Sequence, residues 1–353
     1  MRTSDILVIA PNFKRRLSGV TSTIIQLVPL QAKSLPIVAF GPGLPKALPK
    51  LHVRQLAGLW KRPRTKPFRI WHARRNVEML PGILMRDVLR MPLRLVFTSA
   101  SQRRHTVYTR WLIARMDAVI ATSRRSGAYL SVSHSVVTHG IDLDRFRPAE
   151  DAGGVRRSLN LPDLKTVGCF GRIRHQKGSD LFVEAMIALL PERPGWQAIL
   201  CGRATAEHAG FEAELKRKVA DAGLSGRILF LGEFSDVAPY YRALDLFVAP
   251  QRWEGFGLTP LEAMASGVPV VAADVGVFSD VVGPGTGEIV PPGDLPAMMA
   301  AAARWMDDGD RRRDGAVQSL ETARRNFPLE REAAEIRAVY DLSLIHISEP
   351  TRQ

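Results

Sequence analysis

Short apolar runs alternate with helical patterns along most of the 353-residue chain. Runs such as DILVIA (5–10) and TVGCF (166–170) have the length and the bounding turn residues of buried strands. Strands that alternate with helices form parallel sheets through βαβ units, which places the chain in the α/β class. Ligands of such sheets bind beyond the carboxyl ends of the strands, so we expect the functional residues in the loops that follow strands.

The alternation is interrupted once, at 139–165, by a polar segment that contains proline and glycine. The economical architecture is therefore two α/β domains joined by this segment, with a cleft between them. Before the interruption we expect strands at 5–10, 36–40, 68–72, 94–98 and 117–121 and helices at 20–32 and 102–115. After it we expect strands at 166–170, 196–201, 227–231, 245–249, 268–272 and 287–290, and helices at 179–190, 210–221, 236–243, 260–265, 294–307, 311–326 and 329–341.

The last stretch, LSLIHISEPTRQ (342–353), departs from the helical pattern of residues 330–341. It resembles the translation of a sequencing-library adapter. We therefore expect 342–353 to be a non-native tail and leave it out of the fold prediction.

Charge is distributed unevenly along the chain. The first 150 residues contain 26 Lys and Arg against 7 Asp and Glu, a net charge of +19, and the remainder carries −5. A surplus of this size attracts anionic partners, although a basic but otherwise ordinary soluble surface is the alternative. A nucleic-acid-binding protein is a remote alternative. Because no recognised binding motif occurs and the basic charge is confined to one half, we expect no nucleic acid partner.

The compartment is suggested by the cysteines and the apolar runs. Cys169 and Cys201 each lie in an apolar run that ends in Gly-Arg, which predicts buried strands rather than a disulfide framework or a zinc site. No run reaches the ~18 apolar residues of a spanning helix, and the first run is too short for a signal-peptide core. We expect a cytoplasmic protein whose contact with a membrane, if any, is peripheral.

The segment RWEGFGLTPLEAMASGVPVV (252–271) places two carboxylates around a glycine-containing turn. Thr259, Pro260 and Glu262 have the spacing of a capping box, which predicts that Glu262 ties down a helix start. The same carboxylate could also accept hydrogen bonds from ligand hydroxyls, because a helix start at the carboxyl end of a strand is an anion site.

Glu254 precedes this helix and has no capping role. The glycines beside it, Gly255 and Gly257, allow the backbone to approach a ligand closely. Two carboxylates around an anion-binding turn suit a ligand that carries both phosphates and sugar hydroxyls.

A second candidate site follows the strand at 166–170, in the sequence GRIRHQKGSD. Gly171 and Arg172 end the strand, and Lys177 stands just before a helix. Arginine binds phosphate through its forked guanidinium and lysine through a point charge, so this loop is a candidate phosphate site. A solvated basic loop is the alternative. A third loop, after the first strand, ends in Gly19 at a helix start, which by itself is weak evidence.

Several other enzyme classes are excluded. The G-x-G-x-x-G, P-loop and G-x-S-x-G motifs are absent, which argues against nicotinamide, P-loop and serine-hydrolase chemistry. Asp142 and Asp144 could imitate an acidic metal pair, and the histidines lack metal-ligand spacing. We expect no metal.

Arg172, Lys177, Glu254 and Glu262, in the contexts GR…KG and EGFGLTPLEAMASGVPVV, resemble family 4 of the retaining glycosyltransferases. HGIDLDRFRP (139–148) resembles the interdomain segment of that family. The resemblance implies the GT-B fold, in which two Rossmann-like domains face each other across a cleft and C-terminal helices pack back toward the N-terminal domain. The domains would be an acceptor domain at 1–148, a nucleotide-sugar donor domain at 149–327 and a returning helix at 328–341.

The resemblance also implies roles for residues. Arg172 and Lys177 would bind the donor diphosphate, Glu262 the ribose hydroxyls and Glu254 the transferred sugar, while Gly19 would approach the phosphates from the other domain. The catalytic residues would be Glu254, Arg172 and Lys177, and the further donor contacts Gly171, Gly255, Phe256, Gly257 and Leu258. A metal would not be needed, because cations neutralise the leaving group. No enzymic nucleophile is implied, and His72 and His105 both compete for a sugar contact.

WHARRNVEM (71–79) and TSASQRRH (98–105) resemble the lipopolysaccharide core mannosyltransferases of this family. The implied reaction moves a hexose, mannose from GDP-mannose, onto a lipopolysaccharide inner core at the inner face of the cytoplasmic membrane. Arg74, Arg75, Arg103 and Arg104 would contact this anionic lipid-linked acceptor or the anionic membrane, unless they are ordinary surface arginines. Two alternatives stay open: a UDP-sugar donor with an exopolysaccharide or soluble acceptor, and a catalytically inactive scaffold.

Overall fold

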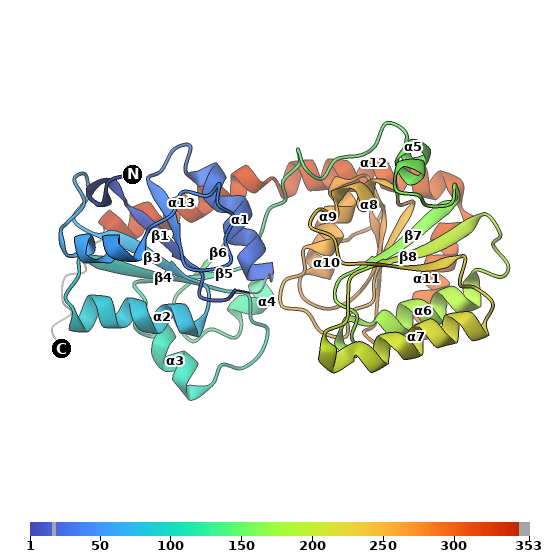
Figure 1. The fold of residues 1–353 in the computed structure, drawn as a ribbon, viewed down its shortest axis with the longest axis horizontal. Coiled ribbons are helices and arrows are strands. Elements are labelled where there is room, and N and C mark those ends of the chain that lie inside the picture. The colour runs from blue at the N-terminus through green and yellow to red at the C-terminus, as the bar shows by residue number, and fades with distance from the viewer. Residues whose placement is uncertain (16–18, 346–353) are drawn as a thin grey trace. The chain divides into compact units, whose positions relative to one another are not determined.

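The computed structural model describes residues 1–15 and 19–345, and the chain divides into two compact units (Figure 1). Unit 1 consists of Met1–Gly140 and Leu329–Gln353, and unit 2 of Ile141–Pro328. Among the described residues each unit contains one sheet of six parallel strands, with helices on both faces. The predicted α/β class with two Rossmann-like halves is confirmed.

The sheet of unit 1 has the strand order β2-β1-β3-β4-β5-β6. Its strands are β1 (Val8–Pro11), β2 (Ile37–Phe40), β3 (Arg69–Ala73), β4 (Leu93–Ser99), β5 (Ala118–Ala121) and β6 (Ser135–Val136). Its helices are α1 (Gly19–Gln31), α2 (Asn76–Ile83), α3 (Val107–Ile113), α4 (Arg124–Gly127) and α13 (Leu329–Ile345), with 3-10 helices η1 (Thr3–Asp5) and η2 (Val53–Trp60) and a π-helix η3 (Leu84–Val88).

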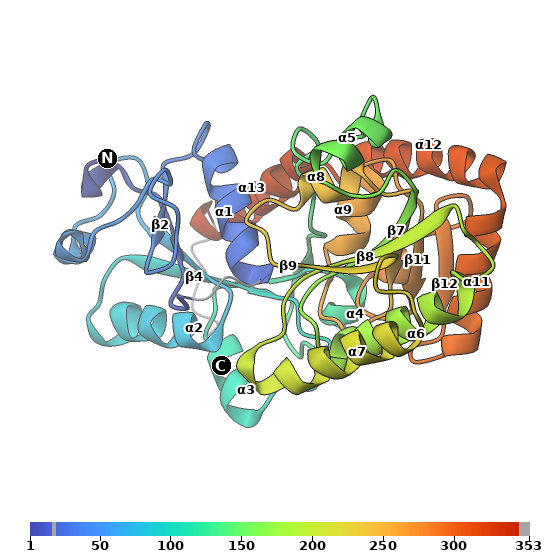
Figure 2. The same ribbon diagram turned by 45° about the vertical axis from the view of Figure 1, so that its right-hand side comes forward.

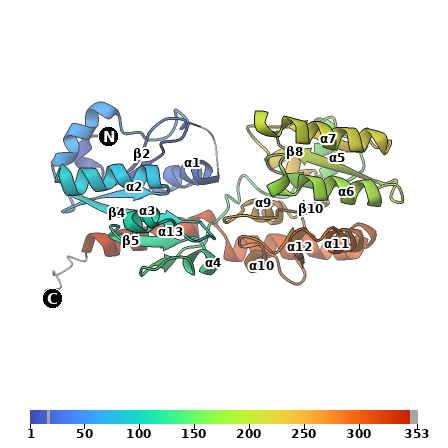
Figure 3. The same ribbon diagram turned by 90° about the horizontal axis from the view of Figure 1, so that it is seen from below.

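Alternate side chains of these strands enter two separate cores, as the period of two requires. Val8 and Ala10 pack with α1 and α13 on one face. Ile9 and Trp71 pack with α2 and α3 on the other face. Figures 1 and 3 show α2 and α3 side by side on this second face.

Helix α13 belongs to unit 1, as the expected return of a C-terminal helix requires. It packs on α1 and buries Tyr340 and Leu344 in the core. The helix continues to Ile345, so the expected break of the helical pattern at Leu342 is wrong. Residues 346–353 of the suspected tail lie outside the described residues.

The sheet of unit 2 has the order β12-β11-β10-β7-β8-β9. Its strands are β7 (Lys165–Phe170), β8 (Trp196–Cys201), β9 (Ile228–Gly232), β10 (Leu246–Ala249), β11 (Val270–Ala273) and β12 (Gly287–Val290). Its helices are α5 (Ala152–Ser158), α6 (Ser179–Leu189), α7 (Ala209–Asp221), α8 (Ala238–Arg242), α9 (Thr259–Ala265), α10 (Phe278–Val281), α11 (Leu295–Asp307) and α12 (Gly309–Asn326), with 3-10 helices η4 (His175–Lys177) and η5 (Ala206–His208).

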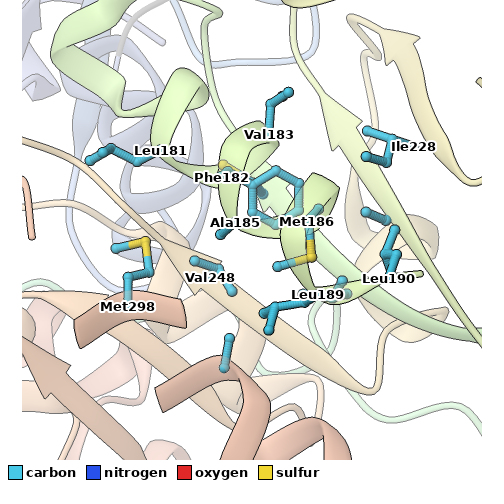
Figure 4. Packing of buried hydrophobic residues seen from close by; sticks show 14 of the residues in the cluster. Leu181, Phe182, Val183, Ala185, Met186, Leu189, Leu190, Ile228, Val248 and Met298 are labelled. Atoms are coloured by element: carbon cyan, nitrogen blue, oxygen red, sulfur yellow. The ribbon is translucent and has the colours of Figure 1, made fainter. Parts of the chain in front are cut away.

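One face of this sheet carries an aliphatic core. Helices α6, α7 and α11 pack against it, and α6 and α7 run below β7 and β8 in the view of Figure 2. Figure 4 shows Phe182 and Met186 of α6 beside Val248 of β10 and Met298 of α11. The opposite face holds an aromatic cluster around Tyr241 of α8. Cys169 and Cys201 are buried in β7 and β8, as predicted, and are free thiols.

The segment 139–165 is not the irregular connection that its composition predicts. Ile141 pairs with Pro328, and Phe146 packs edge-on against Tyr241 at 5.7 Å between ring centroids. Helix α5 follows at Ala152–Ser158. The structure therefore divides the chain after Gly140 and after Pro328, rather than at the expected boundaries after 148 and 327.

Candidate active site

The loop after β7 is built around two glycines with left-handed backbone conformations. Gly171 (φ +136°) leaves the strand, and Gly178 (φ +69°) leads into α6 directly after Lys177. A Cβ atom on Gly178 would lie 2.0 Å from the carbonyl oxygen of Pro250, so only glycine fits there. This close approach sets the β7 loop against the loop that follows β10.

Arg252 joins these two loops. Its backbone N–H donates to the Gln176 carbonyl at 3.0 Å, and its guanidinium donates to both carboxylate oxygens of Asp180 at 2.8 Å. Burial raises the pKa of Asp180 less than the Arg252 guanidinium and its hydrogen bonds lower it, so the carboxylate stays charged. The sequence pattern does not predict this role of Arg252.

Lys177 and Glu254 form a salt bridge between the same two loops. The ammonium contacts one carboxylate oxygen, and the other oxygen accepts the Gly255 N–H at 3.0 Å. The two predicted site residues are thus brought together, and a phosphate that binds Lys177 would compete with Glu254 for the ammonium.

The turn after Glu254 is held by the loop that follows β11. Gly257 has φ +86°, and a Cβ there would lie 2.3 Å from the Phe278 ring. The buried Phe256 accepts the Val277 N–H at its carbonyl at 3.2 Å, and Leu258 precedes the first residue of α9. The backbone of this turn is therefore fixed in place.

Glu262 does not take part in a capping box, so that prediction is wrong. The residue before the helix is Leu258, which already has helical dihedrals, and the buried Thr259 hydroxyl has no partner among the described residues. Glu262 instead accepts a hydrogen bond from the Tyr241 hydroxyl at 2.7 Å. Burial raises the pKa of Glu262, while Tyr241 and the more distant Arg145 oppose this shift. Burial also raises the pKa of Tyr241, which keeps its hydroxyl a donor.

A pocket of about 240 Å³ opens at these strand ends. Arg172 and Glu262 line it, together with two further charged residues, Arg203 and Glu233. Sequence reasoning missed these last two, although Arg203 follows β8 in the same Gly-Arg context that places Arg172 after β7. Another pocket of about 400 Å³, beside β9, has Lys216 as its one charged lining residue and none of the predicted site residues.

Arg75 of unit 1 is not an ordinary surface arginine. Its guanidinium bonds Glu78 at 2.7 Å, Asn12 at 2.9 Å and Thr21 at 3.0 Å. The Glu78 side chain is buried and also accepts the Arg74 N–H at 2.8 Å. These bonds tie together the ends of β1 and β3 and the first turn of α2. Arg103 and Arg104, by contrast, are exposed between β4 and α3.

The two candidate histidines differ. His72 is buried, with its ring nitrogens bonded to Tyr340 at 2.6 Å and Thr98 at 2.7 Å. Burial and then Arg74 hold its pKa well below the usual value, so the ring is neutral and has a structural role. His105 is partly buried, and burial followed by Arg103 and Arg110 lowers its pKa. Gly19 is the first residue of α1.

No group of three or more metal-ligating side chains gathers among residues 1–15 and 19–345. Asp142 uses one carboxylate oxygen to accept the N–H groups of Asp144 and Arg145, which is a turn contact. Within the same ranges, no helix combines the length and the apolar character needed to span a membrane.

Comparison with known proteins identifies the family. A family model described as "Glycosyl transferases group 1" matches residues 164–308, which include the loops described above. The lipopolysaccharide core biosynthesis mannosyltransferase LpsB of Rhizobium meliloti (strain 1021) is 62% identical over 96% of this chain and 97% of its own length. The chain belongs to the group 1 glycosyltransferases. A second relative in this family, the lipopolysaccharide core biosynthesis mannosyltransferase LpcC of Rhizobium leguminosarum bv. viciae, is 56% identical over 96% of both chains.

A solved structure supports the fold of this glycosyltransferase. Anabaena Alr3699/HepE in complex with UDP superimposes with a TM-score of 0.82 over 96% of this chain and 100% of that chain, at 19% identity. At this identity the likeness shows the fold alone. The predicted glycosyltransferase family and GT-B fold are confirmed.

Proposed function

We propose that this glycosyltransferase transfers mannose from GDP-mannose to the inner core of lipopolysaccharide, with retention of configuration. One observation carries the proposal: Arg172 and Glu262 line one pocket, and Lys177 and Glu254 form a salt bridge between the same strand-end loops, in a chain that is 62% identical to a lipopolysaccharide core mannosyltransferase.

Arg172 and Lys177 would hold the donor diphosphate at the amino end of α6. In the transfer step, the bond between the anomeric carbon and the diphosphate oxygen breaks, and its electron pair leaves with the diphosphate. The acceptor hydroxyl attacks the same face, and its proton passes to the departing phosphate oxygen. The two cations stabilise the charge that develops on the leaving group, so the proposed step uses no metal.

Glu262 would accept hydrogen bonds from the ribose hydroxyls, because it lines the pocket and one of its oxygens is already oriented by Tyr241. Glu254 would bind the hydroxyls of the transferred sugar once the diphosphate draws Lys177 away from it. The backbone from Gly255 through Leu258 and the Gly171 turn would complete the donor contacts. Gly19 would approach the phosphates from unit 1.

The pocket chemistry favours a guanine base. Guanine presents adjacent N–H donors on N1 and N2, and a carboxylate accepts such a pair with two oxygens. Glu233 supplies a carboxylate among the lining residues, with Phe234 beside it as an aromatic surface for the base. We expect Glu233→Gln to lower the preference for GDP over UDP about fivefold, measured as the ratio of dissociation constants.

The acceptor would be an anionic lipid-linked saccharide at the cytoplasmic face of the membrane. Unit 1 contains 27 basic and 9 acidic residues, a net charge of +18, which suits a phosphorylated lipid saccharide. Arg103 and Arg104 are exposed and could contact it directly. Arg74 donates to the His72 carbonyl at 3.3 Å, and Arg75 is bonded to Glu78, so these two arginines would shape the end of β3 rather than contact the acceptor.

A donor and acceptor panel tests the proposal. The protein is incubated with labelled GDP-mannose, UDP-glucose and UDP-galactose, each with lipopolysaccharide truncated before its first core mannose. We expect label transfer from GDP-mannose alone, with the product keeping the donor's anomeric configuration by NMR. Transfer of a UDP-sugar, or preference for a soluble acceptor, would favour the alternative donor and acceptor. No transfer from any donor would overturn the proposal.

A further inference from the structure

Exposed apolar side chains gather on one region of unit 1. Fifteen large apolar side chains are exposed among the described residues, and eight of them come from α2, the π-helix η3 with its next residue, α3 and the end of η2. These eight are Trp60, Val77, Leu84, Val88, Leu89, Val107, Tyr108 and Trp111. Exposed apolar residues on soluble proteins are usually scattered, so this gathering calls for an explanation.

The run α2–η3 is apolar on both of its faces. Met79 and Ile83 pack in the core of unit 1, and Gly82 between them is buried. On the opposite side, Val77, Leu84 and Val88 recur at helical spacing and are exposed. A helix that is apolar all round is normally buried, and here one of its apolar faces meets solvent.

Helix α3 repeats this arrangement. Leu112 and Ile113 are buried, whereas Val107, Tyr108 and Trp111 are exposed. The Tyr108 and Trp111 rings stack at 6.3 Å, and the Arg115 guanidinium lies 3.9 Å from the Trp111 ring centroid. The exposed side of the helix therefore presents a small aromatic platform beside a cation.

The two helices form one surface. The Asn76 side chain donates to the Thr109 hydroxyl at 2.7 Å, which sets the first turn of α2 against α3 (Figures 1 and 3). At the other end, the Trp60 indole donates to the Leu89 carbonyl at 2.8 Å and extends the region to η2. We call the exposed residues of these segments the apolar–basic face.

Positive charges outnumber negative charges in the segment that carries this face. Residues 84–117 contain seven arginines and two aspartates. Both aspartates are engaged by arginines: Asp87 by Arg86, and Asp117 by Arg86 and Arg94. Arg103 and Arg104, in the loop before α3, and Arg110 on α3 are exposed. Exposed aliphatic and aromatic side chains together with arginines are the composition of a surface that lies at the lipid headgroup level.

We propose that the apolar–basic face docks this enzyme on an anionic bilayer. Trp111, Leu84 and Val88 enter the interface, and the exposed arginines bind the headgroup phosphates. The inference rests on the proposed function in one respect, because a lipid-anchored acceptor requires an enzyme that reaches the bilayer. Docking would hold unit 1 where such an acceptor is presented.

Vesicle sedimentation tests this surface without donor or acceptor. The full chain is mixed with vesicles of phosphatidylcholine alone, or of phosphatidylcholine with phosphatidylglycerol, and the bound fraction is measured against lipid concentration. We expect binding to the anionic vesicles that weakens with salt. Val88→Glu and Trp111→Glu should each weaken it about tenfold, since each removes one side chain from the interface. Arg103→Ser with Arg104→Ser should weaken it about fivefold per arginine.

Val317→Glu in α12 of unit 2 is the matched control, because Val317 is 58% exposed and Val88 is 66% exposed. It adds the same charge outside the face and should bind like the wild type, and thermal unfolding should show all variants folded. Failure to bind anionic vesicles, or equal binding by Val88→Glu and Val317→Glu, overturns the proposal. Self-association that Trp111→Glu abolishes, without vesicle binding, would make the face a protein interface and also overturn it.

The vesicles contain no lipopolysaccharide, so this result is independent of the sugar transferred. Val88→Glu should keep wild-type turnover on a detergent-solubilised truncated acceptor and lose it on the same acceptor in vesicles. If the protein binds vesicles but transfers nothing from GDP-mannose, the docking proposal is supported and the proposed reaction is wrong.

Discussion

Unit 1 and unit 2 each place six parallel strands between layers of helices, yet their charges differ greatly. Unit 1 contains 27 basic and 9 acidic residues, whereas unit 2 contains 22 and 26. In unit 2 the cations at the strand ends are paired across loops, Lys177 with Glu254 and Arg252 with Asp180. In unit 1, Arg75 at the end of β3 is also paired, with the buried Glu78.

The comparison separates what the sheet does from what the loops do. Parallel topology brings strand-end loops together in both units, which explains where polar residues gather. The sequences of these loops then determine which kind of ligand each unit can bind. Cations that are paired across strand-end loops suit a compact anion, whereas exposed arginines such as Arg103 and Arg104 suit an extended anionic surface.

Removing the unit 2 cations should have the largest effect. We expect Lys177→Ala and Arg172→Ala to lower kcat/KM for the nucleotide sugar about 10²–10³-fold, because each removes a charge that stabilises the leaving diphosphate. Lys216→Ala is the control, since Lys216 is exposed on α7, where it pairs with Glu212 at 2.7 Å and lies 5.5 Å from the Phe230 ring centroid. Steady-state kinetics with folded variants measures this. Wild-type turnover in both Lys177→Ala and Arg172→Ala would remove the diphosphate assignment.

Substitution of Arg75 tests whether its bonds to Glu78, Asn12 and Thr21 stabilise unit 1. Arg75→Ala leaves the buried Glu78 carboxylate without its guanidinium partner, so the free energy of unfolding should fall by about 3 kcal/mol. Arg104→Ala, at an exposed position, should change it by no more than about 0.5 kcal/mol. Urea denaturation compares the two. Equal stability of both variants would mean that Arg75 does not hold the loops together.

Gly178 tests the packing between the donor loops. An alanine there would strain a backbone with φ +69° and press on the Pro250 carbonyl, which should cost about 2 kcal/mol of stability and raise the donor KM. Gly226→Ala is the control, because nothing lies within 4 Å of a Cβ at that position. Thermal unfolding measures the stability, and kinetics at several donor concentrations measure the KM. A Gly178→Ala variant with wild-type stability and wild-type KM would contradict the close approach of the loops.

Glu262 should give the donor site a pH dependence. Burial raises its pKa, so as pH falls through the mildly acidic range the carboxylate takes a proton and affinity for the nucleotide should drop about tenfold. The contribution of Glu262 to the stability of the fold changes with pH in the opposite direction to its contribution to nucleotide affinity. A carboxyl group whose folded pKa is raised stabilises the fold at low pH, and this contribution is lost as pH rises through the folded pKa.

Nucleotide titration at several pH values measures the effect. Glu262→Gln should bind weakly at every pH and remove this dependence. A wild-type affinity that does not change with pH would contradict the role of the Glu262 carboxylate.

The elements that sequence predicts well are those whose pattern is dictated by burial. Every described strand except β6 was expected within a few residues, because each buries a short apolar run such as TVGCF. Strand β6 (Ser135–Val136) was missed, because its two residues are exposed. Helix α2 was missed, because Pro81 and Gly82 interrupt its sequence and both of its faces are apolar.

The sequence predicted Lys177, Glu254 and Glu262 as site residues but not the groups to which they bond in the structure. The capping box at Thr259 was wrong because Tyr241, distant in sequence, occupies the Glu262 carboxylate. Arg75 looked like a surface residue because its partners Asn12 and Thr21 come from another segment of the chain. Such contacts depend on tertiary packing, which local spacing does not encode.

The most direct test of the donor-site assignment is amide hydrogen exchange of the full chain with and without GDP-mannose. We predict slower exchange in two segments of unit 2, 171–178 and 254–262, including the Gly255 amide that bonds Glu254. The segment 225–231 beside the larger pocket should be unaffected. Protection confined to unit 1 or to 225–231, or no protection at saturating donor, would contradict the account.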